Sequence, residues 1–476
     1  KEDPYEEPFE RTAEGWVNCW GGTQAYVPRE DGAGYKITEN AGGKTYCYNQ
    51  GGCLTAVIDP HGNRMEITYC GTTIQRLTLA SGQYLDFFYA AGKVSKITDR
   101  AGRSVRYEYD GEYLTAVTYP NGGTMRYEYD HFGMIVSVTD QNGIRYLKNS
   151  YDEKGRVTKQ DIANGEEHVF LYRDADRQTI YINTQSGRRT IYHYNDKKQP
   201  TKTEYDDGTT KEFAYDQWGN KILEKSRDGS ENRWTYRQDG KLLRQELPGG
   251  LIWEYEYDER GNLVHWWNND GEEFFAQFDA HNNCVREEQV IDAVRRRVQT
   301  YQYDRLGRMI SMKDGNGNVT QYEYWERSGR VSRLTAPEGA EFQYRYDQIE
   351  QCMAIQSEAG EVQFGYTKLG ARALEIDPLG NTTRYRYDLL SNLIAKVLPN
   401  QYDEKTGDGS CYRYEYDAMD HRIRTTDPLG NVFATPHDTA GRLAMEVNPN
   451  TYDPATKSGQ GVRYEYDTDD RRTKVI

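Results

Sequence analysis

Two copies of the tetrapeptide Asp-Pro-Leu-Gly, at Asp377–Gly380 and Asp427–Gly430, suggest a pair of carboxylates for general acid and base chemistry. That chemistry would require the two carboxyl groups to meet in one site. The copies start 50 residues apart, and a related tetrapeptide, Asp59–Gly62, occupies the same position in its own stretch of chain. Proline and glycine at these places are what a β-turn needs. We therefore interpret the aspartates as turn residues.

The segment Asp314–Asn318 begins like a calcium-binding loop but does not continue as one. Its sixth position is Val319 instead of glycine, and its twelfth is Trp325 instead of glutamate. A hairpin turn is the favoured interpretation. The histidines form no HExxH motif, and the chain has no GxSxG, Walker or GxGxxG motif. We expect no catalytic, cofactor-binding or metal-binding residue, and we expect surface or turn positions for His61, His131, His168, His193, His265, His281, His421 and His437.

The seven cysteines do not suggest a disulfide framework, because their number is odd and they are spread over 476 residues. No CxxC pair is present, so a structural zinc site is not expected. Cys47 follows Tyr46 and Cys70 follows Tyr69, which gives the two cysteines related places in neighbouring repeats. A disulfide between them is a minor alternative to free thiols.

Composition excludes several functional classes. The net charge of −15 disfavours nucleic-acid binding, because that needs a concentrated basic surface. The one tight basic run, Arg295–Arg297, is interpreted as a solvated hairpin tip. No apolar run is long enough to span a membrane, and the acidic start KEDPYEEPFE is not a signal peptide. Because the last repeat is incomplete, we expect the chain to be part of a longer protein.

A repeated strand–turn–strand unit positions all of these residues. In Ser104–Thr118, Val105, Tyr107 and Tyr109 alternate with polar residues, and Asp110-Gly111 supplies a tight turn. The closing aromatic of the unit recurs every 20 to 22 residues over most of the chain, at Tyr48, Tyr69, Tyr89, Tyr109, Tyr129, Tyr151, Tyr172, Tyr194, Tyr215, Tyr236, Tyr257, Phe278, Tyr303, Tyr324, Tyr346, Tyr366, Tyr387, Tyr416 and Tyr466. Longer steps mark inserts near 285–299, 399–411 and 449–461. His437 stands where an aromatic is expected, so its unit is degenerate.

Each unit also carries two apolar residues three apart, such as Leu114 and Val117. Side chains three apart cannot share one face of a regular strand. The spacing therefore predicts a β-bulge or a strong twist in the second strand of each unit. A second turn follows it, as at Asn121-Gly122 and Asn142-Gly143.

About twenty repeats of two strands predict an all-β fold, a long antiparallel sheet made of tandem hairpins. Open sheets rarely exceed about ten strands before they curl, and strands twist with one hand, so we expect this sheet to coil into a superhelix. At about 4.8 Å per strand, one turn that used every strand would be about 60 Å wide, and two turns would halve that width. We expect a hollow wall with stacked tyrosine ladders on one face, formed by residues 35–476. Residues 1–34 do not follow the repeat and are predicted to cap it.

The repeats resemble a known family. YEYDGEYLTAVTYPNGG, YEYDERGNLVHW, YQYDRLGRMISMKDGNGN and YRYDLLSNLIAKVLPN are similar to the Rhs/YD repeat, whose signature is Tyr-x-Tyr-Asp-x-x-Gly-Arg-Leu. The resemblance covers roughly Tyr35 to Ile476. Members of this family, including bacterial Rhs proteins, the C component of Tc toxins and the teneurins, build hollow β-shells. Shells of the family often end in a self-cleaving segment whose Asp-Pro-x-Gly motifs are about twenty residues apart. The spacing of 50 here argues against such a segment.

The resemblance implies a non-enzymatic shell segment of a secreted or cell-surface bacterial toxin, which encapsulates and delivers a C-terminal toxin domain that this chain does not contain. Secretion machinery or a target-cell surface component are the further partners that it implies. The alternative is a cell-surface adhesion module that binds glycans or proteins through exposed aromatics such as Trp253, Trp266 and Trp267. Because most tyrosines recur once per repeat, packing is favoured over ligand binding for the aromatics as a class.

Overall fold

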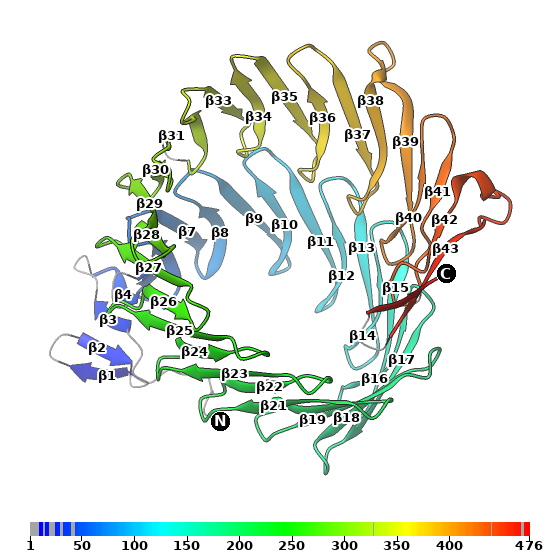
Figure 1. The fold of residues 1–476 in the computed structure, drawn as a ribbon, viewed down its shortest axis with the longest axis horizontal. Coiled ribbons are helices and arrows are strands. Elements are labelled where there is room, and N and C mark those ends of the chain that lie inside the picture. The colour runs from blue at the N-terminus through cyan, green and yellow to red at the C-terminus, as the bar shows by residue number, and fades with distance from the viewer. Residues whose placement is uncertain are drawn as a thin grey trace. The chain divides into compact units, whose positions relative to one another are not determined.

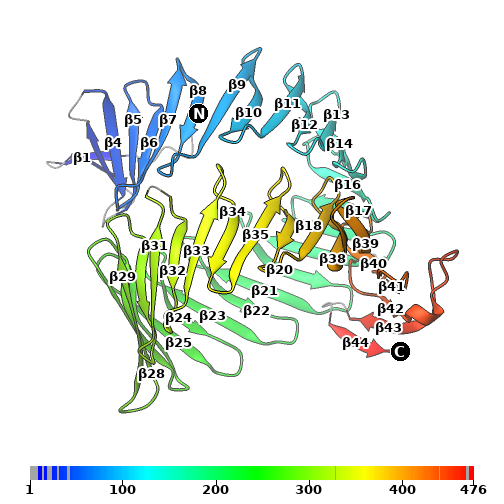
Figure 2. The same ribbon diagram turned by 90° about the horizontal axis from the view of Figure 1, so that it is seen from above.

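The computed structural model describes residues 9–12, 15–18, 24–28, 32–39, 43–326, 328–438, 440–467 and 471–476. Its contacts divide the chain into two compact units, each made of two separate segments. Unit 1 comprises residues 1–102 and 211–350, and unit 2 comprises residues 103–210 and 351–476. Figures 1 and 2 show the ribbon from two directions. The described residues contain no α-helix, and so no helix that could cross a membrane.

Unit 1 is built from short antiparallel strands. Its first segment contains β1 (Phe9–Thr12), β2 (Gly15–Asn18), β3 (Gln24–Pro28), β4 (Gly34–Glu39), β5 (Thr45–Asn49), β6 (Leu54–Ile58), β7 (Arg64–Cys70), β8 (Thr73–Thr78), β9 (Tyr84–Ala90) and β10 (Lys93–Asp99). Its second segment contains β21 (Thr210–Tyr215), β22 (Lys221–Lys225), β23 (Glu231–Tyr236), β24 (Leu242–Glu246), β25 (Ile252–Tyr257), β26 (Leu263–Asn268), β27 (Glu273–Phe278), β28 (Cys284–Val290), β29 (Arg296–Tyr303), β30 (Met309–Lys313), β31 (Val319–Tyr324), β32 (Val331–Thr335) and β33 (Glu341–Tyr346).

Unit 2 repeats the same plan. Its first segment contains β11 (Ser104–Asp110), β12 (Tyr113–Thr118), β13 (Thr124–Tyr129), β14 (Ile135–Thr139), β15 (Arg145–Tyr151), β16 (Val157–Ile162), β17 (Glu167–Arg173), β18 (Gln178–Asn183), β19 (Arg189–Tyr194) and β20 (Pro200–Tyr205). Its second segment contains β34 (Cys352–Ser357), β35 (Gly360–Tyr366), β36 (Arg372–Ile376), β37 (Thr382–Tyr387), β38 (Leu393–Asp403), β39 (Asp408–Tyr416), β40 (Arg422–Thr426), β41 (Val432–Ala434), β42 (Met445–Val447), the single 3₁₀ turn η1 (Pro449–Thr451), β43 (Gly461–Tyr466) and β44 (Arg472–Val475).

Within each segment, strands pair with their sequence neighbours, which confirms the all-β fold of tandem hairpins. In the β11–β12 hairpin, Tyr107 lies opposite Val117 and Tyr109 opposite Leu114. The register shifts between these pairs, because Thr115 is an extra residue in β12. The same shift recurs in most hairpins of both units. The predicted bulge is therefore confirmed, and it places both apolar residues of a repeat opposite its tyrosines.

The two faces of the sheet differ in character. On the face opposite the tyrosines, small residues are buried beneath charged side chains: Ala116, for example, lies between Glu108 and Arg126 and is 1 % exposed. The long side chains of arginine and glutamate can cover such positions with their aliphatic stems while their charges stay in water. Equivalent alanines are buried at positions 56, 354 and 395. This arrangement lets a sheet of low apolar content stay ordered without a large hydrophobic core.

The inserts extend hairpins of the repeat. β28 and β29 form a longer hairpin around 285–299, and Arg295 lies exposed at its tip beside Asp292, as predicted for the basic run. The insert at 399–411 lengthens β38 and β39, and the insert at 449–461 contains η1. The degenerate unit around His437 keeps only the short strands β41 and β42 and an isolated bridge between His437 and Leu443. Of the predicted cap at 1–34, β1–β3 continue the antiparallel pairing to β4, while its other residues up to 31 lie outside the described residues.

Candidate functional site: repeat turns and the seam

The turn after each Tyr-x-Tyr pair, here called the first turn, is held by its aspartate. In the turn that begins at Asp304, one carboxylate oxygen accepts the backbone N–H groups of Leu306 and Arg308, and the other accepts the Arg308 guanidinium. Gly307 adopts φ +75°, which a residue with a side chain rarely does. The Arg308 guanidinium also lies 4.7 Å from the ring centre of Tyr324 in the next repeat. The aspartate, glycine and arginine of the signature thus build one turn and join it to the next.

The closing tyrosine of each repeat bonds to the repeat before it. The Tyr129 hydroxyl donates to the Leu114 carbonyl at 2.7 Å, next to the extra residue Thr115. The ladder between β12 and β13 reaches only to Ala116, so the hydroxyl satisfies a carbonyl that the bulge leaves without a strand partner. In the described part of the chain, the same bond is donated by Tyr69, Tyr151, Tyr172, Tyr303, Tyr324, Tyr346, Tyr366, Tyr387, Tyr416 and Tyr466.

This pattern corrects the expected tyrosine ladder. Equivalent tyrosines are two strands apart, or about 9.6 Å, which is too far for their rings to stack. The intervening strand fills the gap with its apolar pair. Ring stacking is found where the spacing is shorter, as between Tyr35 and Tyr48, whose centroids are 4.8 Å apart. Successive repeats are therefore joined by tyrosine hydroxyls and by cations over the rings.

The second turn of each repeat, which follows the apolar strand, contains the sequence motifs that resembled catalytic or calcium sites. One Asp377 carboxylate oxygen accepts the N–H groups of Leu379 and Asn381, and the other accepts the Asn381 amide at 2.7 Å. Asp427 and Asp314 make the same set of bonds in their own turns. In all three, the asparagine side-chain bond is the largest cause that holds the pKa of the aspartate below its ordinary value. These carboxylates are thus ionised turn caps.

In unit 1, second turns of the first segment bind first turns of the second segment. The Asn63 amide donates to the Leu306 carbonyl at 3.0 Å, and the Gln83 amide donates to the Gln348 carbonyl at 2.8 Å. His61 Nε2 lies 3.0 Å from Asn283 Oδ1. We call this line of contacts the seam. The residues that meet along it are 222 to 265 positions apart in the chain.

Unit 2 has a seam of the same kind. Its second turns at 119–123 and 140–144 approach the first turn at 388–392. The Asn121 amide donates to the Leu389 carbonyl at 2.8 Å, and the Asn142 amide donates to Asp388 at 2.9 Å. Arg103 reaches the Lys368 carbonyl. In both units, residues 222 to 268 positions apart therefore meet along a seam, and each of these contacts joins a second turn to a first turn.

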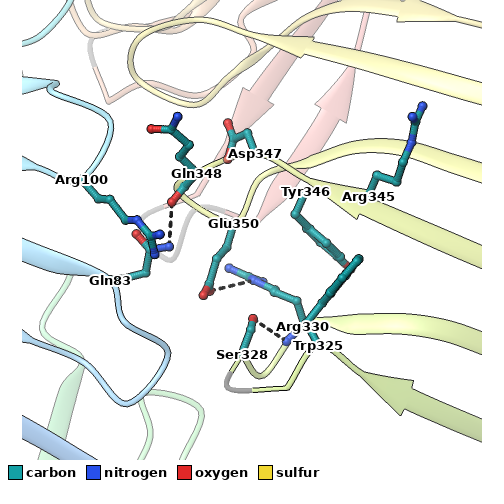
Figure 3. A pocket seen from close by; sticks show the side chains of 10 residues that line it. All are labelled: Gln83, Arg100, Trp325, Ser328, Arg330, Arg345, Tyr346, Asp347, Gln348 and Glu350. Atoms are coloured by element: carbon teal, nitrogen blue, oxygen red, sulfur yellow. Dashed lines mark hydrogen bonds and ion pairs between the residues drawn. The ribbon is translucent and has the colours of Figure 1, made fainter.

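A polar cavity of about 400 Å³ lies on the seam of unit 1. Figure 3 shows Gln83 and Arg100 on one side, facing the turn that bears Gln348 and Glu350. The Glu350 carboxylate lies 3.5 Å from the Arg330 guanidinium. The backbone of Glu350 adopts φ +65° at a position where most first turns have glycine. The other lining residues are Trp325, Ser328, Arg345, Tyr346 and Asp347. The Gln83–Gln348 hydrogen bond joins the two segments at this cavity, and the Arg330–Glu350 ion pair joins two successive turns of the second segment.

Cys47 is buried and Cys70 exposed, and both are free thiols, so the alternative disulfide is not formed. Trp266 stacks on Phe274, with ring centroids 5.3 Å apart and an angle of 6° between the planes, and Trp253 lies 6.3 Å from the same ring. Trp267 stacks on His265. These rings pack against neighbours, and this gives no support to the glycan-binding alternative.

Sequence reasoning missed the seam and two histidine contacts. His61 lies beside His281, and His421 beside His437, at 5.6 and 4.9 Å between ring centroids. The seam had one sequence signal, which is the recurrence of an amide or basic side chain in second turns. That signal could not indicate which distant turn each side chain reaches.

A model of the RHS repeat matches residues 88–124, 111–145 and 303–341. These matches fall on the hairpins that carry the tyrosine bond and the capped first turn. These parts of the chain are repeats of the Rhs/YD type. Over 132 residues, a quarter of its length, it is 29 % identical to a probable deoxyribonuclease RhsB of Dickeya dadantii strain 3937, and this match covers 9 % of RhsB.

Solved structures share the fold of this chain. A chain of the TcdB2–TccC3–Cdc42 crystal structure matches 97 % of it with a TM-score of 0.58 and 13 % identity. A chain of the Photorhabdus luminescens Tc holotoxin pore, with the TccC3 mutation D651A, matches 96 % of it with a TM-score of 0.53 and 13 % identity. The matched regions are 30 % and 28 % of those two chains, so this chain spans less than a third of the solved chains.

Proposed function

We propose that this chain is a segment of a hollow β-shell that encloses a toxin domain C-terminal to it and delivers that domain to a target cell. The observation that carries the proposal is the seam. Contacts between repeats that are more than 200 residues apart favour a closed wall, whereas an array without such contacts would be an open ribbon. The likeness in fold to a chain of the TcdB2–TccC3–Cdc42 structure, which extends over 97 % of the present chain, supports this interpretation.

The composition of the wall also supports enclosure. The sheet buries alanine and keeps tyrosines such as Tyr107, Tyr127 and Tyr129 half-buried, so it does not use a central hydrophobic core. Eight-stranded barrels mark the size beyond which side chains no longer fill the interior. A coil whose turn takes 222 to 268 residues contains many more strands than eight. Such a coil leaves space for a folded domain.

We further propose that the shell segment has no enzymatic activity of its own, that the protein acts outside the producing cell or at its surface, and that the enclosed domain is its main partner. The turn carboxylates that looked most like catalytic groups are occupied by hydrogen bonds within their own turns. Any catalytic activity of the whole protein would then reside in the enclosed domain.

Protease protection of the cargo tests the proposal. The gene region that encodes this chain and its downstream sequence is expressed with a short epitope and a protease site inside the C-terminal domain. A matched protein carries the same epitope and site in the insert at 449–461, which lies in an exposed part of the chain. We expect the site in the insert to be cut at least tenfold faster than the site in the cargo.

Equal cleavage rates at the two sites would overturn enclosure. Electron cryomicroscopy of the same protein gives an independent reading, because enclosure requires density for the C-terminal domain inside the wall. A domain found outside the wall, or an open ribbon, would also contradict the proposal.

A further inference from the structure

Two departures from the repeat pattern meet at one point of unit 2. In many first turns, as at Asp258 and Asp304, the residue four positions after the aspartate is Asn or Arg, which can only donate to the carboxylate through nitrogen-bound protons. In the turn at Asp417 that residue is His421. The other departure is His437, which replaces the closing aromatic of its repeat. Although they are 16 positions apart, the two imidazole rings stack with centroids 4.9 Å apart.

The Asp417 carboxylate completes the group. One of its oxygens accepts the backbone N–H groups of Met419 and His421, each at 2.9 Å. The other lies 3.1 Å from His421 Nδ1.

His437 supplies the observation that points to a ligand. Its Nδ1 has no solvent contact and no hydrogen-bond partner among the described residues. A buried polar nitrogen without a partner is unfavourable, and structures rarely retain one without a reason. One potential ligand atom from each of Asp417, His421 and His437 lies within 4.8 Å of the other two.

We propose that Asp417, His421 and His437 form a binding site for a divalent transition-metal ion of the zinc type. Two imidazole nitrogens and one carboxylate oxygen are a donor set that zinc prefers, and water can take the fourth position of its tetrahedron. Ligand atoms about 2 Å from one ion lie within about 4 Å of each other, so the three atoms, now within 4.8 Å, need to approach by only about 1 Å to hold an ion. All three residues are only partly buried, which leaves the ion a path from solvent.

The position of the site gives the ion a structural consequence. The degenerate repeat has the three-residue strands β41 and β42, whereas the strands β4 to β40 of the preceding repeats each have five or more residues. An ion held by Asp417 and His421 in one turn and by His437 in the next repeat would replace strand pairing that this repeat lacks. Binding therefore stabilises the degenerate repeat, since an ion that binds only the folded state raises the stability of that state.

The repeat pattern itself provides the test variants. His421→Asn restores the residue found at this position in other turns, whose amide can still donate to Asp417. His437→Tyr restores the missing aromatic. Both changes remove a metal ligand while following the sequence rule of the array, and circular dichroism checks that each variant folds. His131→Asn, which removes an exposed histidine away from the site, is the matched control.

The full chain, prepared without a histidine tag, is titrated with Co²⁺ followed by visible absorption and with Zn²⁺ followed by calorimetry. We expect one ion per chain with the absorption of a tetrahedral Co²⁺ complex, at least tenfold weaker binding in both ligand variants, and unchanged binding in His131→Asn. Zn²⁺ should raise the melting temperature of the unmodified chain and of His131→Asn, but not that of either ligand variant. No binding by the unmodified chain, or equal binding by both ligand variants, would overturn the site. If one variant fails to fold, the other variant decides.

Discussion

At the scale of single residues, the side chains of the repeat signature bind backbone groups that the bulge and the turn leave without a partner. The bulge leaves a carbonyl without a strand partner, and the tyrosine hydroxyl of the next repeat satisfies it. The turn reverses the chain with unpaired N–H groups, and the aspartate accepts them. Arg308 links the capped turn to the next tyrosine, because its guanidinium binds Asp304 and lies over the ring of Tyr324. The contribution of each contact to stability can therefore be measured by comparing a substitution that removes it with the same substitution at a nearby residue that lacks the contact.

Tyr324→Phe should lower the free energy of unfolding by about 1 kcal/mol, because it removes the hydroxyl that donates to the Met309 carbonyl at 2.6 Å. Tyr322→Phe is the control, since the Tyr322 hydroxyl makes no hydrogen bond to a described residue and its removal should change stability little. Urea unfolding of the two variants measures the difference. Equal losses would mean that the ring, and not the hydroxyl, carries the contribution.

Asp239 gives a pH dependence with a definite sign. A bond from the Arg237 guanidinium is the largest cause that lowers its pKa to about 2. Because the folded-state pKa lies below the ordinary value of 3.8, the contribution of Asp239 to stability is complete above about pH 4 and is lost as the pH falls towards 2. Asp239→Asn should therefore be less stable than the unmodified chain at pH 6, and the gap should shrink by pH 3. A gap that is constant in urea midpoints over this range would contradict the assignment.

At the scale of elements, a turn reverses the chain, and some turns also contact a distant turn across the seam. Glycine substitutions separate these two roles. Alanine at Gly307 must adopt φ +75°, and its Cβ would lie 2.7 Å from the ring atoms of His61 across the seam. Alanine at Gly317 would be equally strained at φ +90°, but its Cβ would meet only the Lys313 side chain at 3.9 Å. The backbone strain costs about 1–2 kcal/mol in either case.

Gly307→Ala should therefore destabilise the chain more than Gly317→Ala does. It should also speed hydrogen exchange at 59–63, where His61 and Asn63 hold the seam. Exchange at 59–63 in Gly317→Ala should match that of the unmodified chain. Similar exchange in the two variants would show that His61 moves aside without loosening the seam.

At the scale of the whole molecule, the seams tie distant parts of the chain together. Trypsin should cut first at Arg295–Arg297, because the Arg295 side chain is 75 % exposed at a hairpin tip. Each unit contains residues from both resulting fragments, so the nicked halves should elute as one species in size-exclusion chromatography. Fragments that separate in native buffer would contradict the seam contacts.

The pairing of β28 with β29 also holds the nicked halves, so a seam variant is needed as the comparison. Asn121 and Asn142 donate across the seam of unit 2. A nicked chain with both residues changed to alanine should separate at a lower urea concentration than the nicked unmodified chain. The same concentration for both would mean that strand pairing alone keeps the halves together.

Much of this architecture could be predicted because its causes lie within one repeat. The alternation in Ser104–Thr118, the Asp-Gly turn and the spacing between Leu114 and Val117 predicted two strands, a tight turn and a bulge, and all three are present. The interpretation of Asp377 and Asp427 as turn residues agrees with their bonds for the same reason. The tyrosine ladder was predicted wrongly, because the distance between equivalent rings depends on the intervening strand.

The sequence by itself determined the repeating unit, since strand, bulge and turn depend on interactions within about 20 residues. Only the tertiary structure decided which turns meet at the seam, that Asn63 reaches Leu306, and that His421 lies on His437. A seam contact depends on twist summed over many strands, so a small rotation in each hairpin changes the partner of every turn. Aspartates at Asp377 and Asp427 that resembled a catalytic pair are turn caps, while the proposed metal site lies where the repeat pattern fails.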